Sequence, residues 1–442
     1  MFATKNLLTG VIRIITVNNV GLNNIDLEGR VKANETSNRI KTVDMSVSGF
    51  FGVRTAFELP PDMGFKVISG GTTYYAELDP NSPVNQPKMF RNSNGGWTIL
   101  ADEKYNLTGA LVPSVEAPSH LKEFWQIEVT EATGGGGAHN TAFGQQVYLS
   151  EAPEQDIRIK LVVPVGYTLI RDRLPNGLEY SPLSGISDGD SSANLNFAPV
   201  DGKKITLRSN VPAPIIPETN LGIQQGDVIV LNTIRGSDYL GLVEKVLQAN
   251  GDARLFLSVT DSMIQGIGPE KVWELVGRSD VYVSNREEFE RMVNLKINDP
   301  RTLAEQMFRV QNALVQREGS PGRVYVTFGQ TGSAALGQER VVYYQDTASG
   351  TINPFKRLNI VNTNGCGDSY LAVVVIKEIL GHPLVETLNF ANTAGHICAT
   401  MPTASGNWMA TERAITSFRD KYGKPDFYRY DSRKSEFVRM RM

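Results

Sequence analysis

The feature that most limits the fold of this sequence is an alternation of short apolar strands with helical segments after residue 156. Strand-like runs rich in Val, Ile and Leu lie at 157–166, 226–234, 253–259, 280–285 and 323–329. Helical patterns lie between them at 239–250, 271–277 and 301–317. Such alternation is typical of a mostly parallel sheet with helices on both faces. We therefore predict an α/β core with three layers, αβα.

Two helices in this region carry clear start and stop signals. Asp299 and Pro300 form a cap and first-turn pair before the periodic segment 301–317. Gly381 and Pro383 are expected to stop a second helix, which follows Asp368.

The N-terminal third of the chain has a different character. VIRIITV at 11–17 is predicted to be a strand, and the turn-rich NNVGLNNID follows it. From 27 to 130, strand-like pieces are separated by Pro, Gly and Asn clusters, and helical periodicity is scarce. We predict a core made of residues 1–26 and 131–442, interrupted at 27–130 by a β-rich lid or inserted domain.

Composition excludes several classes of function. The formal net charge of −3 provides no basic field for a nucleic acid or an anionic membrane surface. The two cysteines, Cys366 and Cys398, and the four scattered histidines do not have the spacing of a zinc site. No run approaches the ~18 apolar residues of a membrane-spanning helix, and the N-terminus lacks the layout of a cleavable signal. We expect a cytoplasmic protein with neither a nucleic acid nor a membrane partner.

The stretch NTNGCGDSY, residues 362–370, is the strongest candidate for chemistry. Glycines allow a backbone to pass close to a ligand, and the first N–H groups of a helix attract anions. Gly365, Cys366 and Gly367 are positioned to supply such a nest. Asp368 would then stand beside the bound anion, where its carboxylate can accept a proton from an attacking hydroxyl. This pattern favours phosphoryl transfer to an alcohol.

Five stretches, in order along the chain, resemble the ribokinase-like carbohydrate kinases of the PfkB family. NTNGCGD resembles the family signature D-T-x-G-A-G-D, and GLNNID at 21–26 resembles its first substrate element. GGGAHN at 135–140 resembles the second substrate element, and SNREE at 284–288 has the N-x-x-E spacing. VTFGQTGSAAL at 326–336 and the segment 389–406 resemble the elements around the nucleotide. The resemblance implies a ribokinase-like fold and covers residues 11–26 and most of 131–420.

The resemblance also implies roles for particular residues. Asp368 would be the base, and the amides of Gly365, Cys366 and Gly367 the anion hole. A sugar or nucleoside acceptor would bind at Asp26, Asn24, Gly135, Gly136 and Asn140. ATP would bind along Thr327, Gly329 and Gly332, with Asn392 near the base. Mg²⁺ would be organised by Asn285 and Glu288 through water, because this ion dehydrates reluctantly.

Three features depart from the family pattern. Asn362 and Asn364 occupy positions that potassium-binding members use, which leaves activation by a monovalent cation doubtful. Cys366 replaces the usual Ala, and we interpret it as a small filler, with sensitivity to oxidation as the alternative. The region 27–130 is much longer than the small β lid of the family. Edge strands of an exposed lid offer a route to a symmetric homodimer.

We interpret the chain as an ATP-dependent kinase that transfers the γ-phosphoryl group to a hydroxyl of a sugar or nucleoside. The alternative is a catalytically silent ribokinase-like protein that binds a sugar or nucleotide or acts as a scaffold. An NAD-linked oxidoreductase ranks lower, since no G-x-G-x-x-G follows the first strand. Asn285 with Glu288 also fits an ordinary helix cap, and Asp26 fits a solvated turn equally well.

Overall fold

The computed structural model describes most of the chain in 21 segments. These are residues 15–21, 24–31, 40–44, 53–80, 89–100, 103–108, 111, 114–135, 137–151, 157–164, 178–183, 193–200, 203–209, 223–224, 226–232, 240–249, 253–316, 320–347, 363–401, 410–422 and 426–440. All structural statements below concern these segments.

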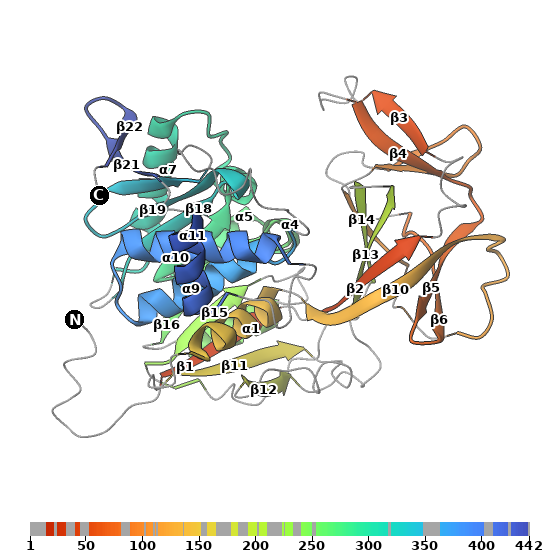
Figure 1. Cartoon of the computed structure of the whole chain (residues 1–442), viewed down its shortest axis with the longest axis horizontal. Coiled ribbons are helices and arrows are strands. Elements are labelled where there is room, and N and C mark those ends of the chain that lie inside the picture. The colour runs from red at the N-terminus through yellow and green to blue at the C-terminus, as the bar shows by residue number, and fades with distance from the viewer. Residues whose placement is uncertain are drawn as a thin grey trace.

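The larger body, at the left of Figure 1, is built on an eleven-stranded sheet in the order β12-β11-β1-β15-β16-β17-β18-β19-β20-β21-β22. The strands from β12 to β18 in that order run parallel, and β19 to β22 continue the sheet antiparallel. The strands are β1 (Ile15–Gly21), β11 (Ile157–Pro164), β12 (Leu178–Leu183), β15 (Val228–Asn232), β16 (Arg254–Ser258), β17 (Val281–Asn285), β18 (Arg323–Thr327), β19 (Gly332–Leu336), β20 (Val342–Asp346), β21 (Asp426–Asp431) and β22 (Glu436–Arg439).

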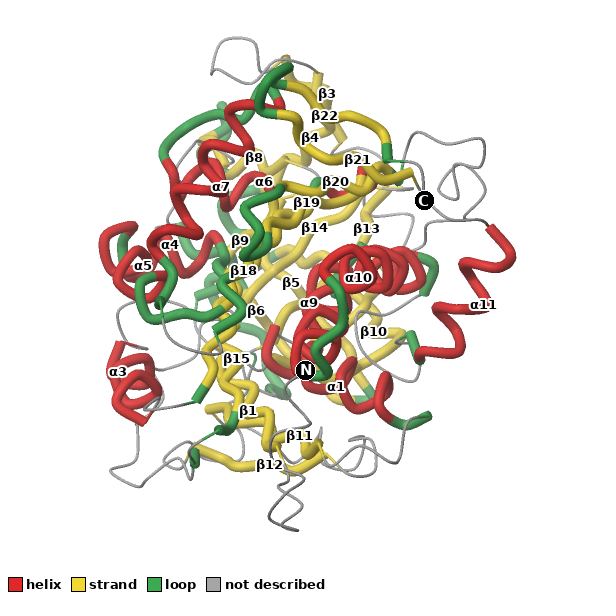
Figure 2. Tube along the Cα trace, turned by 90° about the vertical axis from the view of Figure 1, so that its left-hand side faces the viewer, coloured by secondary structure: helices red, strands yellow, loops and turns green. Residues whose placement is uncertain are grey.

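Helices cover both faces of this sheet. Successive residues of a strand point to opposite sides, so an apolar strand presents apolar side chains on both faces, and both must be covered. In β15, Val228 and Val230 belong to one apolar core, and Ile229 and Leu231 belong to the other. The first core is closed by α1 (Gly137–Leu149), α9 (Cys366–Ile379), α10 (Leu384–Ala399) and α11 (Glu412–Tyr422). The second is closed by α3 (Leu240–Ala249), α4 (Asp261–Ile267), α5 (Pro269–Val276), α6 (Arg286–Val293) and α7 (Pro300–Ala313). The predicted three-layer αβα core is confirmed, and Figure 2 shows α1, α9 and α10 side by side over the sheet.

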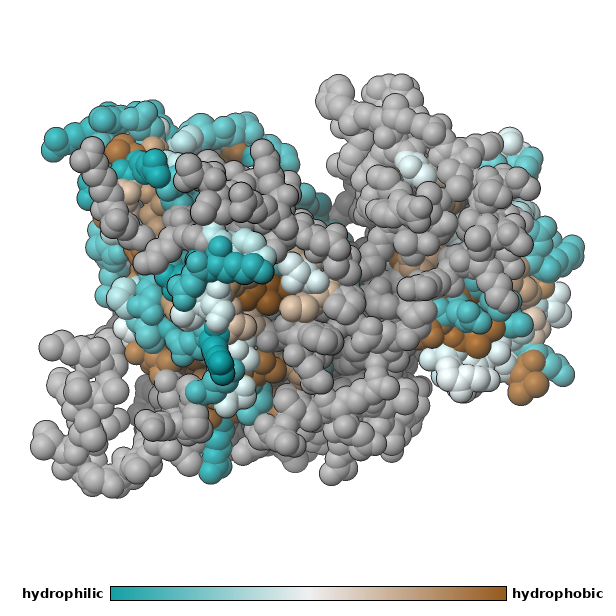
Figure 3. All heavy atoms as spheres, viewed as in Figure 1, coloured by the Kyte–Doolittle hydropathy of each residue, from teal (hydrophilic) through white to brown (hydrophobic). Residues whose placement is uncertain are grey.

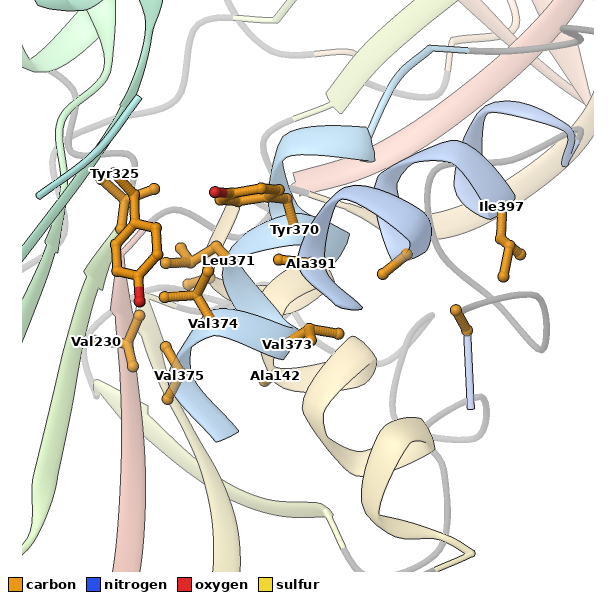
Figure 4. Packing of buried hydrophobic residues seen from close by; sticks show 14 of the residues in the cluster. Ala142, Val230, Tyr325, Tyr370, Leu371, Val373, Val374, Val375, Ala391 and Ile397 are labelled. Carbon is orange, nitrogen blue, oxygen red and sulfur yellow. The ribbon is translucent and has the colours of Figure 1, made fainter. Parts of the chain in front are cut away.

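Helix α9 is buried along most of its length. Its segment Leu371–Ile376 is apolar without a polar face, as expected for a helix that is covered all round. Figure 4 shows Leu371 and Val374 directed toward strand residues Val230 and Tyr325, while Val373 faces α1. This packing fixes the position of the helix start, which carries the candidate site.

The smaller body, at the right of Figure 1, is all β and contains two sheets. One has seven strands in the order β6-β5-β10-β2-β13-β14-β9, namely β2 (Asn24–Val31), β5 (Met63–Ser69), β6 (Thr72–Ala76), β9 (Glu103–Asn106), β10 (Glu123–Gly135), β13 (Ala193–Val200) and β14 (Lys203–Arg208). The other, in the order β3-β4-β8-β7, contains β3 (Ile40–Asp44), β4 (Val53–Leu59), β7 (Met89–Arg91) and β8 (Trp97–Leu100).

The two β sheets pack face to face around Trp125. The Phe57 ring, from the four-stranded sheet, lies 5.7 Å from the Trp125 ring, and the rings of Phe65 and Phe197 each lie 6.0 Å from it. The smaller body is therefore a sandwich with its own aromatic core. Strands β13 and β14 belong to it, although they lie within residues 131–442, which the sequence predicts to form the α/β core.

Two local expectations compare informatively with the structure. Asp299 caps α7 as predicted, since its Oδ1 accepts the N–H of Thr302 at 2.8 Å. The first strand continues past the predicted end at residue 17, because β1 spans Ile15–Gly21; residues 11–14 of the predicted strand lie outside the described segments. Asn18 and Asn19 are in the strand despite their turn propensity, since both pair with β11 on one side and β15 on the other.

The described surface facing the viewer in Figure 3 is mostly hydrophilic or intermediate, with apolar residues in small patches. Large apolar side chains are gathered mainly in the cores between layers. None of the helices in the described segments is long and apolar enough to cross a membrane.

Candidate active site

The carboxyl ends of the parallel strands bring several polar residues to one edge of the main sheet. The register pairs Gly21 of β1 with Asn232 of β15, and Asn232 with Ser258 of β16. It also pairs Asn285 of β17 with Thr327 of β18. In open α/β sheets, ligands bind at this edge. The predicted stretches 21–26, 284–288 and 326–336 therefore meet this edge. They are far apart in sequence but are aligned by strand pairing.

The start of α9 has the geometry expected of an anion site. Gly365, the N-cap, has φ of 75°, a left-handed conformation that strongly favours glycine. Its carbonyl accepts the N–H of Ser369 at 2.8 Å, while the N–H of Cys366 makes only a long contact, 3.4 Å, with the Thr363 carbonyl. A Cβ added to Gly367 would meet no atom of the described residues within 4 Å. The first turn thus offers N–H groups without intrahelical acceptors beside open space.

Asp368, in that first turn, is held by amides from two other elements. Asn140 of α1 donates from Nδ2 to Asp368 Oδ2 at 3.0 Å. Asn232 donates from Nδ2 to Asp368 Oδ1 at 3.2 Å and also to Thr141 Oγ1 at 3.0 Å. Asp368 itself is only half-buried, so the amides orient a carboxylate that a ligand can still reach.

Asn232 and Thr141 also belong to this cluster, although no sequence motif described above includes them. Asn232 is 1% exposed and closes the buried strand VIVLN. The available signal was its position, since it is the first polar residue at the carboxyl end of a parallel strand, where ligand-binding side chains gather. Thr141 follows Asn140 in a helix with no distinguishing pattern, so only the tertiary contact reveals it.

Pairing of β2 with β10 brings the two predicted substrate elements together. Asn24 lies opposite Gly135, and Asp26 lies opposite Thr133. Strand β10 runs from the smaller body toward the larger one and ends just before α1, as Figure 1 shows. Gly136 lies outside the described segments. Asn140, five residues after Gly135, ends the second of these elements and is buried.

Asn285 and Glu288 form a reciprocal capping box at the start of α6. Asn285 Oδ1 accepts the Glu288 N–H at 2.9 Å, and Glu288 Oε2 accepts the Asn285 N–H at 3.0 Å. Glu288 Oε1 accepts the N–H of Asp261 at 3.2 Å. The helix-cap interpretation is therefore present in the structure. A carboxylate fixed in this way retains lone pairs and fits a water-mediated role toward Mg²⁺. In the described segments, no group of three or more His, Cys, Asp or Glu side chains could hold a metal directly.

The predicted nucleotide residues lie around the β18–β19 connection and α10. Thr327 ends β18, and Gly329 lies exposed in the short 3₁₀ turn that follows, with φ of 60°. Gly332 has φ of 117°, and a Cβ there would lie 1.9 Å from the Gln345 carbonyl oxygen, so close packing on β20 already requires a glycine. Asn392 is buried and donates from Nδ2 to Gln345 Oε1 at 2.6 Å. Gly332 and Asn392 thus both have roles in packing.

The opposite end of α9 is anchored by buried charges. The Glu378 carboxylate pairs with the Arg323 guanidinium and accepts a hydrogen bond from the Tyr325 hydroxyl. Burial raises the pKa of Glu378, and the neighbouring Arg323 opposes that rise. Lys377, also buried, pairs with Glu386 at 3.3 Å and Glu412 at 3.0 Å. These pairs tie α9 to β18, α10 and α11, and so support the fixed position of its first turn.

With this geometry in view, comparison with known proteins identifies the family. The sequence model of the pfkB family carbohydrate kinases matches residues 130–410, more than half of the chain. The chain belongs to the pfkB carbohydrate kinase family. No curated protein sequence matches this family member.

Solved structures show that this pfkB protein has the ribokinase-like fold. Ribokinase from Giardia lamblia is 12% identical with a TM-score of 0.55, and the match covers 91% of this chain and 99% of the other. Ribokinase from Arabidopsis thaliana, complexed with ribose and ATP, is 13% identical with a TM-score of 0.52, over 92% and 99% of the two chains. Phosphofructokinase-2 from Escherichia coli, in complex with substrates and products, is 13% identical with a TM-score of 0.52, over 93% and 99%.

Proposed function

We propose that this pfkB family protein is an ATP-dependent kinase that transfers the γ-phosphoryl group to a hydroxyl of a sugar or nucleoside. The observation that carries the proposal is the placement of Asp368. It stands in the first turn of α9, directly after the Gly365-Cys366-Gly367 backbone, and Asn140 and Asn232 hold its two oxygens. A carboxylate that only stabilised a helix start would need neither the glycines nor the two amide partners.

In the proposed reaction Asp368 accepts the proton of the acceptor hydroxyl as its oxygen attacks the γ-phosphorus of ATP. The bond between that oxygen and phosphorus forms, the bond from phosphorus to the β–γ bridging oxygen breaks, and ADP leaves. The N–H groups of Gly365, Cys366 and Gly367 stabilise charge on the transferred group. Asp26 and Asn140 orient the acceptor, and Asn24, Gly135 and Gly136 line its site.

Thr327, Gly329 and Gly332 would line the ATP site, with Asn392 near the adenine. Bound Mg²⁺ would neutralise phosphate charge. Asn285 and Glu288 would hold it through water, in keeping with the fixed Glu288 carboxylate.

A homodimer formed through the lid would pair along edge strands. In the described seven-stranded sheet the edge strands are β6 and β9.

The test is ADP release from ATP and Mg²⁺ across pentoses, hexoses, sugar phosphates and nucleosides. We expect turnover with one acceptor class, and a fall of about 100-fold or more in kcat for Asp368→Asn. Gly367→Ala is the matched second variant. The added Cβ has room in the protein, so the melting temperature should stay unchanged. It would occupy space beside the anion hole, so kcat should fall.

Full turnover by a folded Asp368→Asn protein would disprove the proposed base. ATP or sugar binding by calorimetry, with no turnover on any acceptor, would instead favour the silent binding or scaffold protein. Thermal melts of each variant establish that an activity loss is not a loss of fold.

A further inference from the structure

The two cysteines of this sequence are brought together beside the candidate site. Cys366 is the first residue of α9, and Cys398 lies in the last turn of α10, 32 positions later. Their side chains are hydrogen-bonded to each other. Cys398 Sγ also lies 3.6 Å from the Asn364 carbonyl oxygen, to which it donates. Both thiols are free, so this is a contact between two reduced sulfurs.

The two helices approach closely at this point. A Cβ added to Gly395 of α10 would lie 3.3 Å from the Cys366 carbonyl oxygen. Cys398 is 2% exposed, whereas Cys366 is partly exposed at the mouth of the site. A small oxidant therefore has access to one sulfur of the pair, and the other sulfur is already in contact with it.

The two sulfurs differ in acidity. The hydrogen bond to Cys398 raises the pKa of the Cys366 thiol, and burial and the Asp368 charge raise it further. Hydrogen bonds from Cys366 and Ser369 lower the pKa of the Cys398 thiol, against the effect of burial. Exposure decides which sulfur meets an oxidant first: Cys366 is the one that a peroxide can approach, and Cys398 is the buried partner beside it.

We propose that Cys366 and Cys398 are a modification site, at which a peroxide forms a reversible disulfide that stops the reaction at Asp368. The effect on activity rests on the proposed kinase function, whereas formation of the disulfide does not. First, Cys366 attacks the peroxide, the O–O bond breaks, and the thiol becomes a sulfenic acid with release of water. Cys398 then attacks that sulfur, the S–S bond forms, and hydroxide leaves with the remaining thiol proton as a second water.

The balance is two thiols oxidised to one disulfide while one peroxide is reduced to two waters. An S–S bond is ~2.05 Å long, well below any hydrogen-bonded sulfur contact. Forming it would pull the first turn of α9 toward the end of α10. That turn carries Asp368 and the Gly365 and Gly367 amides, and a displacement of about 1 Å in such a constellation can cost on the order of 100-fold in rate.

The experiment treats reduced protein with hydrogen peroxide, alkylates the remaining thiols, and analyses peptides without reduction by mass spectrometry. We expect a peptide pair linked through Cys366 and Cys398, lost on treatment with dithiothreitol. Because the sequence holds no other cysteine, the identity of the two linked residues is unambiguous, and a non-reducing gel separates a link within one chain from a link between two chains. ADP production and ATP affinity by calorimetry are measured on the same samples, and ADP production should fall at least about tenfold and return on reduction.

Cys398→Ser is the matched control, with Cys398→Ala in case the polar replacement unfolds the buried site. Both should keep the activity of the reduced protein and resist peroxide. If the only products were sulfinic or sulfonic acid at Cys366, or disulfides between two chains, the proposed modification would be wrong. If peroxide lowered the activity of Cys398→Ser as much as that of the unsubstituted protein, the proposed effect on activity would be wrong. The same holds if the disulfide changed neither turnover nor ATP affinity. A linked peptide with altered ATP affinity in a protein without turnover would support the modification while refuting the kinase.

Discussion

At the scale of single residues, the candidate site depends on contacts around one carboxylate. Asp368 receives one amide donor on each oxygen, from Asn140 on Oδ2 and Asn232 on Oδ1. Asn232 has a second acceptor, Thr141 Oγ1, so its amide is fixed from two sides. This arrangement makes Asn232 a positioning residue for the proposed base, because it acts through Asp368 and not on the substrate.

Asn232→Ala should lower kcat about tenfold, since a lost hydrogen bond to a charged group costs ~1.5 kcal/mol. The KM for ATP should change little, because Asn232 lies away from the predicted nucleotide residues. Thr141→Val is the control, as it removes the other acceptor and leaves the bond to Asp368. Equal losses in the two variants would mean that Asn232 supports the packing of α1 rather than the orientation of Asp368.

At the scale of elements, the start of α6 combines a structural and a proposed functional role. The capping box satisfies N–H groups that would otherwise lack partners, and Glu288 also binds the first residue of α4 through Asp261 N–H. The same carboxylate is the proposed outer-sphere support for Mg²⁺. Capping depends on an acceptor oxygen, whereas attraction of a cation depends on charge, so the two roles can be separated.

Glu288→Gln should keep most of the capping box, since Gln is accepted at this position of the motif. The free energy of unfolding should change by less than ~1 kcal/mol, while the Mg²⁺ concentration for half-maximal activity should rise about tenfold. Asp299→Asn, which removes a carboxylate at the N-cap of α7, should leave the Mg²⁺ dependence unchanged. A Glu288→Gln enzyme with ordinary Mg²⁺ dependence would restrict Asn285 and Glu288 to the capping role.

At the scale of the whole molecule, burial places two histidines where protonation opposes folding. Burial lowers the pKa of His139 to about 4, against a weaker effect of the Asn140 side chain. It lowers the pKa of His396 to about 3. An unfolded histidine has a pKa of ~6.5, so between these values the unfolded chain binds protons that the folded protein does not. Stability is therefore complete above pH ~6.5 and decreases as the pH falls toward the folded values.

Urea denaturation at pH 7, 6 and 5 should show a decreasing free energy of unfolding. Each histidine contributes a slope that approaches ~1.4 kcal/mol per pH unit once the pH is below 6. His396→Gln should remove about half of the contribution of the two histidines. An unchanged slope in this variant would show that other groups determine the acid sensitivity.

Much of the architecture follows from local patterns in the sequence. The alternation of apolar strands and helices predicts the parallel sheet, because the two faces of each strand must both be buried. The cap at Asp299 and the stop at Gly381 depend only on neighbouring residues. The ordered motifs around Asp368 indicate the family, which the match over residues 130–410 shows.

Only the tertiary structure decided which distant residues meet. Asn140 and Asp368 are 228 positions apart and come into contact because α1 and α9 pack side by side on the same face of the sheet. Strands β13 and β14 join the smaller body by pairing with β2 and β9, and no local pattern specifies such partners. The Cys366–Cys398 contact likewise arises where α9 and α10 approach. Periodicity encodes which face of an element is buried, but the choice of partner depends on the packing of the whole chain.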